Sequence, residues 1–158
     1  MKYQNEGGVS LKQAFDLLRS ASVVPVIDLQ QLLNAVIFNY LIGNNDAHGK
    51  NFSLLYRDGQ ISLAPFYDLL CTVYYSELSP KMAMKIGGKY KPDEVYARHF
   101  EKFAVETGLS KPMVLKQVAV IAGKIIGSFD GIEAEMPASS KLIAFIRERV
   151  ERFKAQIV

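Results

Sequence analysis

The sequence predicts a mainly helical domain with one short β-hairpin, and three observations support this fold class. Apolar residues recur at helical spacing over residues 11–21, over residues 27–42 and through the last third of the chain. Two β-prone runs, residues 52–56 and 60–66, are joined through an Asp-Gly pair, which favours a hairpin turn. The chain has 158 residues, of which 49% are hydrophobic, so it can bury the core of one ordinary domain. We therefore expect a helical bundle that carries a hairpin in its first half.

The first two helices have recognisable ends. Ser10 can cap the first helix, LKQAFDLLRSA, which places its leucines and phenylalanine close to one face. The second helix, IDLQQLLNAVIFNYLI, is apolar around most of its circumference, and Gly43 follows it. We expect this second helix to be buried in the middle of the domain. Residues 67–92 hold turn signals without a sustained period, so we expect mostly irregular structure there.

The last third of the chain is predicted to form three helices. Asp93 can cap a helix that runs to about Thr107, where Gly108 ends it. Ser110 opens the next helix, with a proline just inside it, and the final helix follows Pro137. Both of these helices carry regularly spaced apolar residues, a pattern that indicates core and surface and implies no chemistry.

Composition and charge exclude several classes of protein. The formal charge of +3 is too mild to argue for nucleic-acid binding on its own. Cys71 is the single cysteine, which excludes a disulfide framework and, with two histidines, leaves too few ligands for a structural zinc site. Residues 1–10 lack the apolar core of a signal peptide, and no apolar run approaches the ~18 residues of a membrane span. We expect a cytoplasmic protein that contacts no membrane.

A polar loop, GNNDAHGKN (residues 43–51), directly follows the buried helix. Within this loop Asp46 and Asn51 have the spacing D-x-x-x-x-N of a protein-kinase catalytic loop. In kinase chemistry the aspartate accepts the proton or hydrogen bond of the attacking hydroxyl. The asparagine offers its amide oxygen to Mg²⁺ without adding negative charge beside the phosphates. The spacing by itself occurs by chance in many proteins.

The surroundings of the polar loop make the pattern more specific. In kinases the catalytic loop follows a buried helix and precedes a short hairpin, which leads to a second metal-binding aspartate. Here the predicted hairpin leads to PFYD (residues 65–68), which ends in Asp68. Two carboxylates and one amide beside a single hairpin suit Mg²⁺ and a nucleotide. The combination therefore predicts a kinase-like lobe with a site for ATP and Mg²⁺.

Each part of the pattern also has a simpler interpretation. Asn44, Asn45 and Asp46 could form an ordinary turn at a helix C-terminus, because Asn and Asp tolerate left-handed backbone conformations. Asp68 could instead cap a helix. It is the combination of helix, loop, hairpin and aspartate that favours the functional reading.

Two further residues of the polar loop are candidates for the site. His48 could be a catalytic base or a metal ligand, or it could support the loop backbone through hydrogen bonds. Lys50 could reach a phosphate as a point charge, and it could equally be a solvated surface lysine.

The stretch IGNNDAHGKNFSLL…ISLAPFYDLL closely resembles the HipA-like serine/threonine protein kinases, the toxin components of bacterial toxin–antitoxin systems. The opening KYQNEGG and the helix SLKQAFDLLR resemble the segment that precedes the catalytic loop in that family. By this resemblance Asp46 is the catalytic aspartate, Asn51 is a Mg²⁺ ligand and Asp68 is the counterpart of the metal-binding aspartate of the kinase DFG motif. His48 and Lys50 match the family pattern D-x-H-x-K-N, which makes them candidate catalytic residues and makes Lys50 a candidate contact to the nucleotide.

The resemblance also implies partners. Members of this family phosphorylate serine or threonine on cytoplasmic proteins, aminoacyl-tRNA synthetases among them. Many are neutralised by a small helix-turn-helix antitoxin that also binds operator DNA. We accordingly expect a protein substrate and an antitoxin, with DNA contacted only through the antitoxin.

One half of the kinase pattern is missing from the sequence. Residues 1–158 correspond to a C-terminal lobe, without the G-x-G-x-x-G loop and the V-A-I-K-like lysine of an N-terminal nucleotide-binding lobe. The chain could be a catalytic lobe that needs an N-terminal lobe, supplied in the same or another chain. It could instead be a truncated, non-catalytic remnant that binds an antitoxin-like or client protein. Retention of Asp46, Asn51 and Asp68 favours the first hypothesis, while a metal-dependent nuclease is a more distant alternative.

Overall fold

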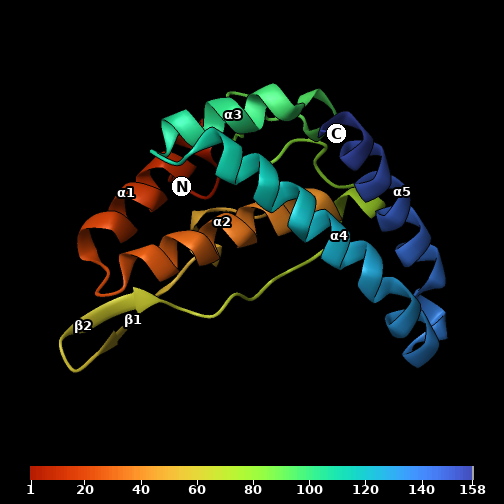
Figure 1. Cartoon of the computed structure of the whole chain (residues 1–158), viewed down its shortest axis with the longest axis horizontal. Helices are drawn as coiled ribbons and strands as arrows, with labels where there is room; N and C mark the ends of the chain where they lie inside the picture. Colours follow the sequence, from red (N-terminus) through yellow and green to blue (C-terminus); the bar gives the residue numbers. More distant parts are fainter. Residues whose placement is uncertain (158) are drawn as a thin grey trace.

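The expectation of a mainly helical fold with one hairpin is confirmed by the computed structural model, which describes residues 1–157 (Figure 1). The helices are α1 (Leu11–Ala21), α2 (Pro25–Ile42), α3 (Ala97–Glu106), α4 (Lys111–Glu135) and α5 (Ser140–Ile157), and the strands are β1 (Leu54–Arg57) and β2 (Gln60–Leu63). Helix α4 crosses over α2, with α3 and α5 beside it, and the hairpin lies near the turn between α1 and α2 (Figure 1).

The ends of α1 and α2 follow from the residues predicted to set them. The Ser10 hydroxyl accepts a hydrogen bond from the backbone N–H of Gln13, whose side chain in turn accepts one from the Ser10 N–H. Helix α2 begins at Pro25, a residue whose fixed φ suits the first helical turn, and it ends where Gly43 adopts a left-handed φ of 85°. Both helices therefore lie where the sequence placed them, with α2 beginning slightly earlier.

Helix α2 is the buried centre of the domain, as predicted. Its Leu33 and Ile37 are fully buried, and Tyr40 packs edge-on against Phe100 of α3 and Phe153 of α5. Burying a large apolar side chain stabilises a fold by about 1.5–3 kcal/mol. Because α2 contacts helices on several sides, the chain that leaves its C-terminus starts from a rigid support.

Helix α4 differs from the sequence expectation about membrane spans. Within residues 1–157 it is the one helix that is long and apolar enough, by length and composition alone, to cross a membrane. One side of it is nevertheless built into the core, where Val114, Val118 and Phe129 are buried. Helix α4 therefore packs against the core along one face only.

The hairpin has the predicted turn but shorter strands. Asp58 and Gly59 both have positive φ, 51° and 75°, as a two-residue turn of the I′ type requires. The ladder pairs Leu54 with Leu63 and Arg57 with Gln60. The hairpin is joined to α2 by a buried carboxylate that the sequence did not reveal: Asp28 accepts hydrogen bonds from the Leu63 N–H at 2.8 Å and from the Ser22 hydroxyl at 2.6 Å.

The prediction that Asp93 caps the third helix is wrong. Asp93 lies in a short 3₁₀ turn, Pro92–Glu94, and α3 begins only at Ala97. Val95 is buried and extended between the turn and the helix, which keeps the two apart. The remaining expectation for this region is confirmed, because residues 67–92 contain only short turns and one isolated bridge.

Candidate active site

The polar loop (residues 43–51) is attached to the end of α2 through a close backbone approach. Gly43 has a left-handed φ, and a Cβ atom at this position would clash with Cγ2 of Val73. The Gly43 carbonyl accepts hydrogen bonds from the Val73 N–H at 3.1 Å and from the Thr72 hydroxyl at 3.2 Å. Glycine is therefore required here for both its conformation and its size.

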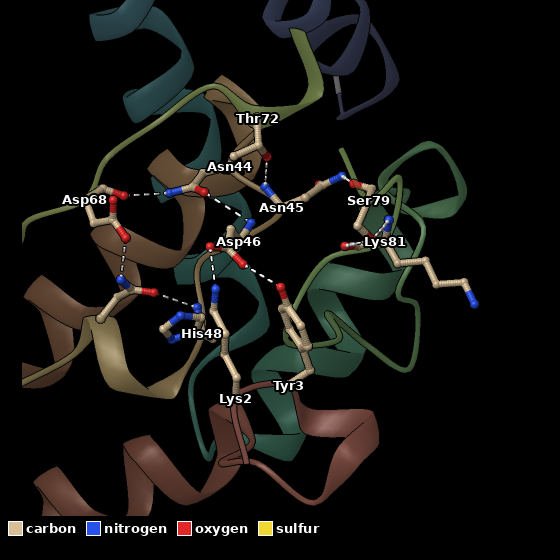
Figure 2. A network of polar contacts seen from close by, with 11 residues as sticks. Lys2, Tyr3, Asn44, Asn45, Asp46, His48, Asp68, Thr72, Ser79 and Lys81 are labelled. Atoms are coloured by element: carbon tan, nitrogen blue, oxygen red, sulfur yellow. Dashed lines mark hydrogen bonds and ion pairs between the residues drawn. The ribbon is translucent and has the colours of Figure 1, made fainter. Parts of the chain in front are cut away.

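Asn44 connects the two segments that carry the candidate carboxylates. Its side chain is buried and donates to the Asp68 backbone carbonyl at 3.0 Å and to the Asn39 side chain at 2.9 Å. Its Oδ1 accepts from the Asp46 N–H at 3.2 Å (Figure 2). A buried amide must be paired, so these hydrogen bonds fix Asp46 and Asp68 relative to each other.

Asn45 holds the loop against the segment that follows Asp68. Its backbone N–H donates to the Thr72 hydroxyl at 2.8 Å, and its side chain donates to the Ser79 carbonyl at 3.2 Å (Figure 2). Its carbonyl accepts from the Ala83 N–H at 2.7 Å. Asn44 and Asn45 thus form more than the ordinary helix-end turn that was one reading of the sequence.

Asn51 and Asp68 are in direct contact. The Asn51 amide nitrogen donates to Asp68 Oδ2 at 2.8 Å, while the Asn51 Oδ1 accepts from the His48 backbone N–H at 3.0 Å. Asp68 has a left-handed φ of 60° and its side chain is exposed. Such a conformation is uncommon for a residue other than glycine, and its cost is met by the surrounding contacts.

The two aromatic residues before Asp68 hold it beside the polar loop. Phe66 packs edge-on against Phe52, with ring centroids 6.1 Å apart. The Tyr67 hydroxyl donates to the Lys50 backbone carbonyl at 2.6 Å. The PFYD segment is therefore joined to residues 50–52 by one apolar and one polar contact.

Asp46 has both carboxylate oxygens engaged by the N-terminal segment of the chain. The Lys2 ammonium lies 3.0 Å from Oδ2, and the Tyr3 hydroxyl donates to Oδ1 at 3.0 Å (Figure 2). Asp46 is about one-third exposed, with 34% of its side-chain surface accessible. It can therefore meet a substrate hydroxyl while these contacts hold its orientation.

His48 and Lys50 have different environments. His48 is buried, its ring lies edge-on to Tyr3, and its Nδ1 has no hydrogen-bond partner among the described residues. Burial, aided by the positive charge of Lys2, lowers the pKa of His48, so its ring is neutral at neutral pH. Lys50 is exposed on the turn that carries Asn51.

Asn51 and Asp68 suit a Mg²⁺ ion by the chemistry of their donor atoms. Mg²⁺ is commonly held by one or two carboxylates, with phosphate and water oxygens completing its shell. One carboxylate and one amide oxygen meet that need, and the Asn51 oxygen keeps a second lone pair beside its bond from His48. Within residues 1–157 no group of three or more His, Cys, Asp or Glu side chains could hold a metal alone, so phosphate oxygens would have to contribute.

Sequence reasoning located the polar loop and Asp68 but missed the residues that organise them. Asn44 was read as a turn residue, although an asparagine directly after a buried helix has to find partners. Lys2 and Tyr3 belong to the stretch KYQNEGG, and nothing local in the sequence shows that they reach Asp46.

Comparison with known proteins identifies the family of this chain. A family model for the HipA-like C-terminal domain matches residues 1–129. A putative kinase of Sinorhizobium fredii is 50% identical over 117 residues, which cover 74% of this chain and 28% of that protein. The serine/threonine-protein kinase toxin HipA of Shewanella oneidensis is 32% identical over 118 residues, which cover 75% of this chain and 27% of that protein.

A solved structure shows the same fold. The Shewanella oneidensis toxin–antitoxin complex of HipA, HipB and operator DNA matches 95% of this chain and 37% of that chain, with a TM-score of 0.87 and 27% identity. The chain thus spans less than a third of the length of the two relatives above, at 28% and 27%. Its fold is kinase-like, and the chain belongs to the HipA-like C-terminal domain family.

Proposed function

We propose that residues 1–158 form the catalytic C-terminal lobe of a HipA-like serine/threonine protein kinase. The lobe transfers the γ-phosphate of ATP to a serine or threonine hydroxyl of a cytoplasmic protein. The observation that carries this proposal is the arrangement of Asp46, Asn51 and Asp68 around the polar loop. The Asn51 amide nitrogen lies 2.8 Å from Asp68 Oδ2. A kinase needs this set of one base and two metal ligands, and a plain turn does not.

Asp46 is the residue proposed to act on the substrate. Its carboxylate accepts the hydrogen bond of the incoming hydroxyl, orients that oxygen and takes up its proton. The Asn44 side chain and the hydrogen bonds from Lys2 and Tyr3 hold Asp46 in place before substrate arrives. Preorganisation of this kind lowers the cost of reaching the transition state.

Asn51 and Asp68 are proposed to hold Mg²⁺, and Lys50 to meet a phosphate oxygen. When bound, Mg²⁺-ATP supplies the phosphoryl group, and its metal neutralises the charge that develops on the phosphates. His48 donates its backbone N–H to Asn51 and keeps that amide oriented. We assign its side chain to the site as a neutral group beside Tyr3.

An N-terminal lobe is proposed to complete the enzyme, in the same chain or from another. Phosphoryl transfer depends on positioning and charge neutralisation, so this lobe alone should have little activity. By analogy with the HipA–HipB–operator complex, we propose a helix-turn-helix antitoxin as partner, through which DNA is contacted indirectly. An aminoacyl-tRNA synthetase is the substrate class that the family resemblance favours.

Transfer of ³²P from labelled ATP with Mg²⁺ tests the proposal. The chain is assayed alone and together with a family N-terminal lobe, with Asp46→Asn as the blank. Transfer by the mixture that disappears in Asp46→Asn is the expected result. If the folded parent mixture transfers nothing, the binding-module alternative is favoured. If folded Asp46→Asn transfers as well as the parent, Asp46 is not the catalytic residue.

The metal ligands are tested separately by binding. Asp68→Ala should weaken Mg²⁺-ATP binding by the complete kinase by about tenfold or more, because a carboxylate ligand to the metal is lost. Titration calorimetry measures the binding, and thermal melts check the fold. Equal affinity in parent and Asp68→Ala would remove Asp68 from the list of ligands.

A further inference from the structure

The N-terminal segment (residues 1–9) lies directly on the polar loop. Lys2 and Tyr3 each contact one oxygen of Asp46, and the Tyr3 ring meets the His48 ring at a centroid distance of 6.4 Å (Figure 2). These two residues are far from Asp46 in sequence, so the contacts exist only because the fold brings the segment there. The turn and the backbone hydrogen bonds of residues 1–9 produce these contacts.

Glycines shape the turn that presents Lys2 and Tyr3. Gly7 has a φ of 91°, and the Gly8 N–H donates to the Tyr3 carbonyl at 2.9 Å. A Cβ at Gly8 would lie 2.7 Å from that carbonyl oxygen. The turn therefore closes only with a glycine at this position, which gives the EGG sequence a structural reason.

The same segment is anchored on both sides of Asp46. The Gln4 N–H donates to the Ala83 carbonyl at 3.0 Å, and the Gln4 side chain accepts from the Lys85 N–H at 3.0 Å. On the other side, a Cβ at Gly49 would lie 2.8 Å from Cβ of Val9. The glycine of the polar loop thus allows the N-terminal segment to approach closely.

From this geometry we propose that Lys2 and Tyr3 are positioning residues for Asp46, an inference that rests on the proposed kinase function. Tyr3 fixes one carboxylate oxygen by a neutral hydrogen bond. Lys2 fixes the other by a charge-assisted hydrogen bond from its ammonium group, 3.0 Å from Oδ2. Together they limit rotation of the Asp46 side chain, so that one lone pair faces the incoming hydroxyl.

A simple surface ion pair is the alternative explanation. The Lys2 and Asp46 side chains are 43% and 34% exposed, and such exposed pairs contribute little to stability. Two observations go beyond that reading: both oxygens of one carboxylate are occupied from the same segment, and that segment is held by further hydrogen bonds. The weak effect on stability is an advantage, because variants at Lys2 should remain folded.

Kinetics of the complete kinase, this chain with a family N-terminal lobe, tests the proposal. Lys2→Met and Tyr3→Phe should lower kcat about 10- to 100-fold, because a small misplacement of a catalytic group costs up to about 10² in rate. The KM for ATP should change less than about threefold. Lys2→Arg should recover part of the loss, since it restores the charge. Lys12→Met, which removes an exposed lysine–aspartate pair on α1, should leave kcat unchanged.

A second readout does not depend on activity. The side-chain carboxyl ¹³C signal of Asp46, recorded by NMR at one neutral pH on the chain alone, should move in Lys2→Met and in Tyr3→Phe but not in Lys12→Met. Gly8→Ala should move it too, because the added methyl group displaces the turn. A parent-like kcat in both Lys2→Met and Tyr3→Phe would overturn the proposal. An Asp46 carboxyl ¹³C shift that stays at its parent value in both variants would overturn it too.

These outcomes are separable from failure of the proposed function. If no mixture transfers phosphate, the kinase assignment fails; if Asp46→Asn still transfers it, the catalytic role of Asp46 fails. The Asp46 signal then decides by itself whether Lys2 and Tyr3 position this carboxylate.

Discussion

At the scale of single residues, the domain uses buried polar side chains as connectors. Asn44 joins Asp46 to Asp68, and Asp28 joins α2 to the hairpin. In both cases one side chain satisfies a backbone group, the Asp68 carbonyl or the Leu63 N–H, that is distant from it in sequence. Such residues cost more when removed than a net hydrogen bond is worth, because a buried partner is left unpaired.

Asp28 offers a test of this principle that needs no assay of activity. Asp28→Ala leaves the buried Leu63 N–H without an acceptor, so we expect a loss of about 1–3 kcal/mol in the free energy of unfolding. Asp28→Asn keeps an oxygen at the same place and should lose clearly less. Urea unfolding measures both variants. Equal losses in the two would mean that charge, and not the hydrogen bond, is what Asp28 contributes.

At the scale of elements, the glycine that follows α2 and the glycine inside α4 have different structural roles. Gly43 ends α2 in a left-handed conformation against Val73, whereas Gly123 lies inside α4, where an added Cβ meets nothing within 4 Å. The first glycine is required by the fold. The second only lowers helix propensity.

We therefore expect opposite effects from one chemical change. Gly43→Ala should destabilise the domain by at least about 1–2 kcal/mol, the cost of a left-handed residue with a Cβ, and the contact with Val73 adds to this. Gly123→Ala should stabilise it by up to about 1 kcal/mol through helix propensity. Urea midpoints of the two variants decide the matter. A stabilised Gly43→Ala, or a clearly destabilised Gly123→Ala, would show that the backbone conformation is not what limits these positions.

Helix α5 supports the end of α2 from which the polar loop starts, although α5 lies beyond the stretch matched by the family model. Arg149 donates from Nε and a terminal nitrogen to the Tyr40 carbonyl, at 3.4 and 3.1 Å, and its guanidinium lies over the Tyr40 ring. Burial lowers the pKa of Arg149, although the group stays charged. The positive charge meets the C-terminal end of α2, where the helix dipole favours it, just before the polar loop begins.

At the scale of the whole molecule, the success of sequence reasoning depended on how local each signal was. The start of α1, the end of α2 and the hairpin turn were predicted because a cap, a glycine and an Asp-Gly pair act within a few residues. The prediction that Asp93 caps α3 was wrong because Val95 is buried with an extended backbone, so the helix starts after it. Spacing and context single out Asp46, Asn51 and Asp68, and the structure brings Asn51 and Asp68 into contact. Lys2, Tyr3 and Asn44 could not be assigned, since their partners are known only once the fold is known.

The acid sensitivity of the whole domain should depend in part on His99. His99 is buried at the start of α3, and its Nδ1 accepts the Tyr96 N–H at 3.0 Å, which requires a neutral ring. Burial, aided by the charge of Arg98, lowers the pKa of His99. The unfolded chain then binds a proton first as pH falls, so stability is complete above about pH 6.5 and decreases as pH drops through the interval between the two pKa values. Exposed carboxylates such as Asp16 and Glu94, whose pKa is lowered by neighbouring lysines, act in a separate range below about pH 4.5.

Thermal melts between pH 7.5 and pH 5 should therefore show a falling Tm for the parent chain. His99→Gln can accept the Tyr96 N–H through its side-chain oxygen but binds no proton, so its Tm should fall less over the same range. Its Tm at pH 7.5 should be close to that of the parent if the hydrogen bond is preserved. Parallel curves for parent and His99→Gln would mean that the imidazole at the start of α3 can accept a proton without loss of packing. The acid sensitivity would then have to come from another titrating group of the domain.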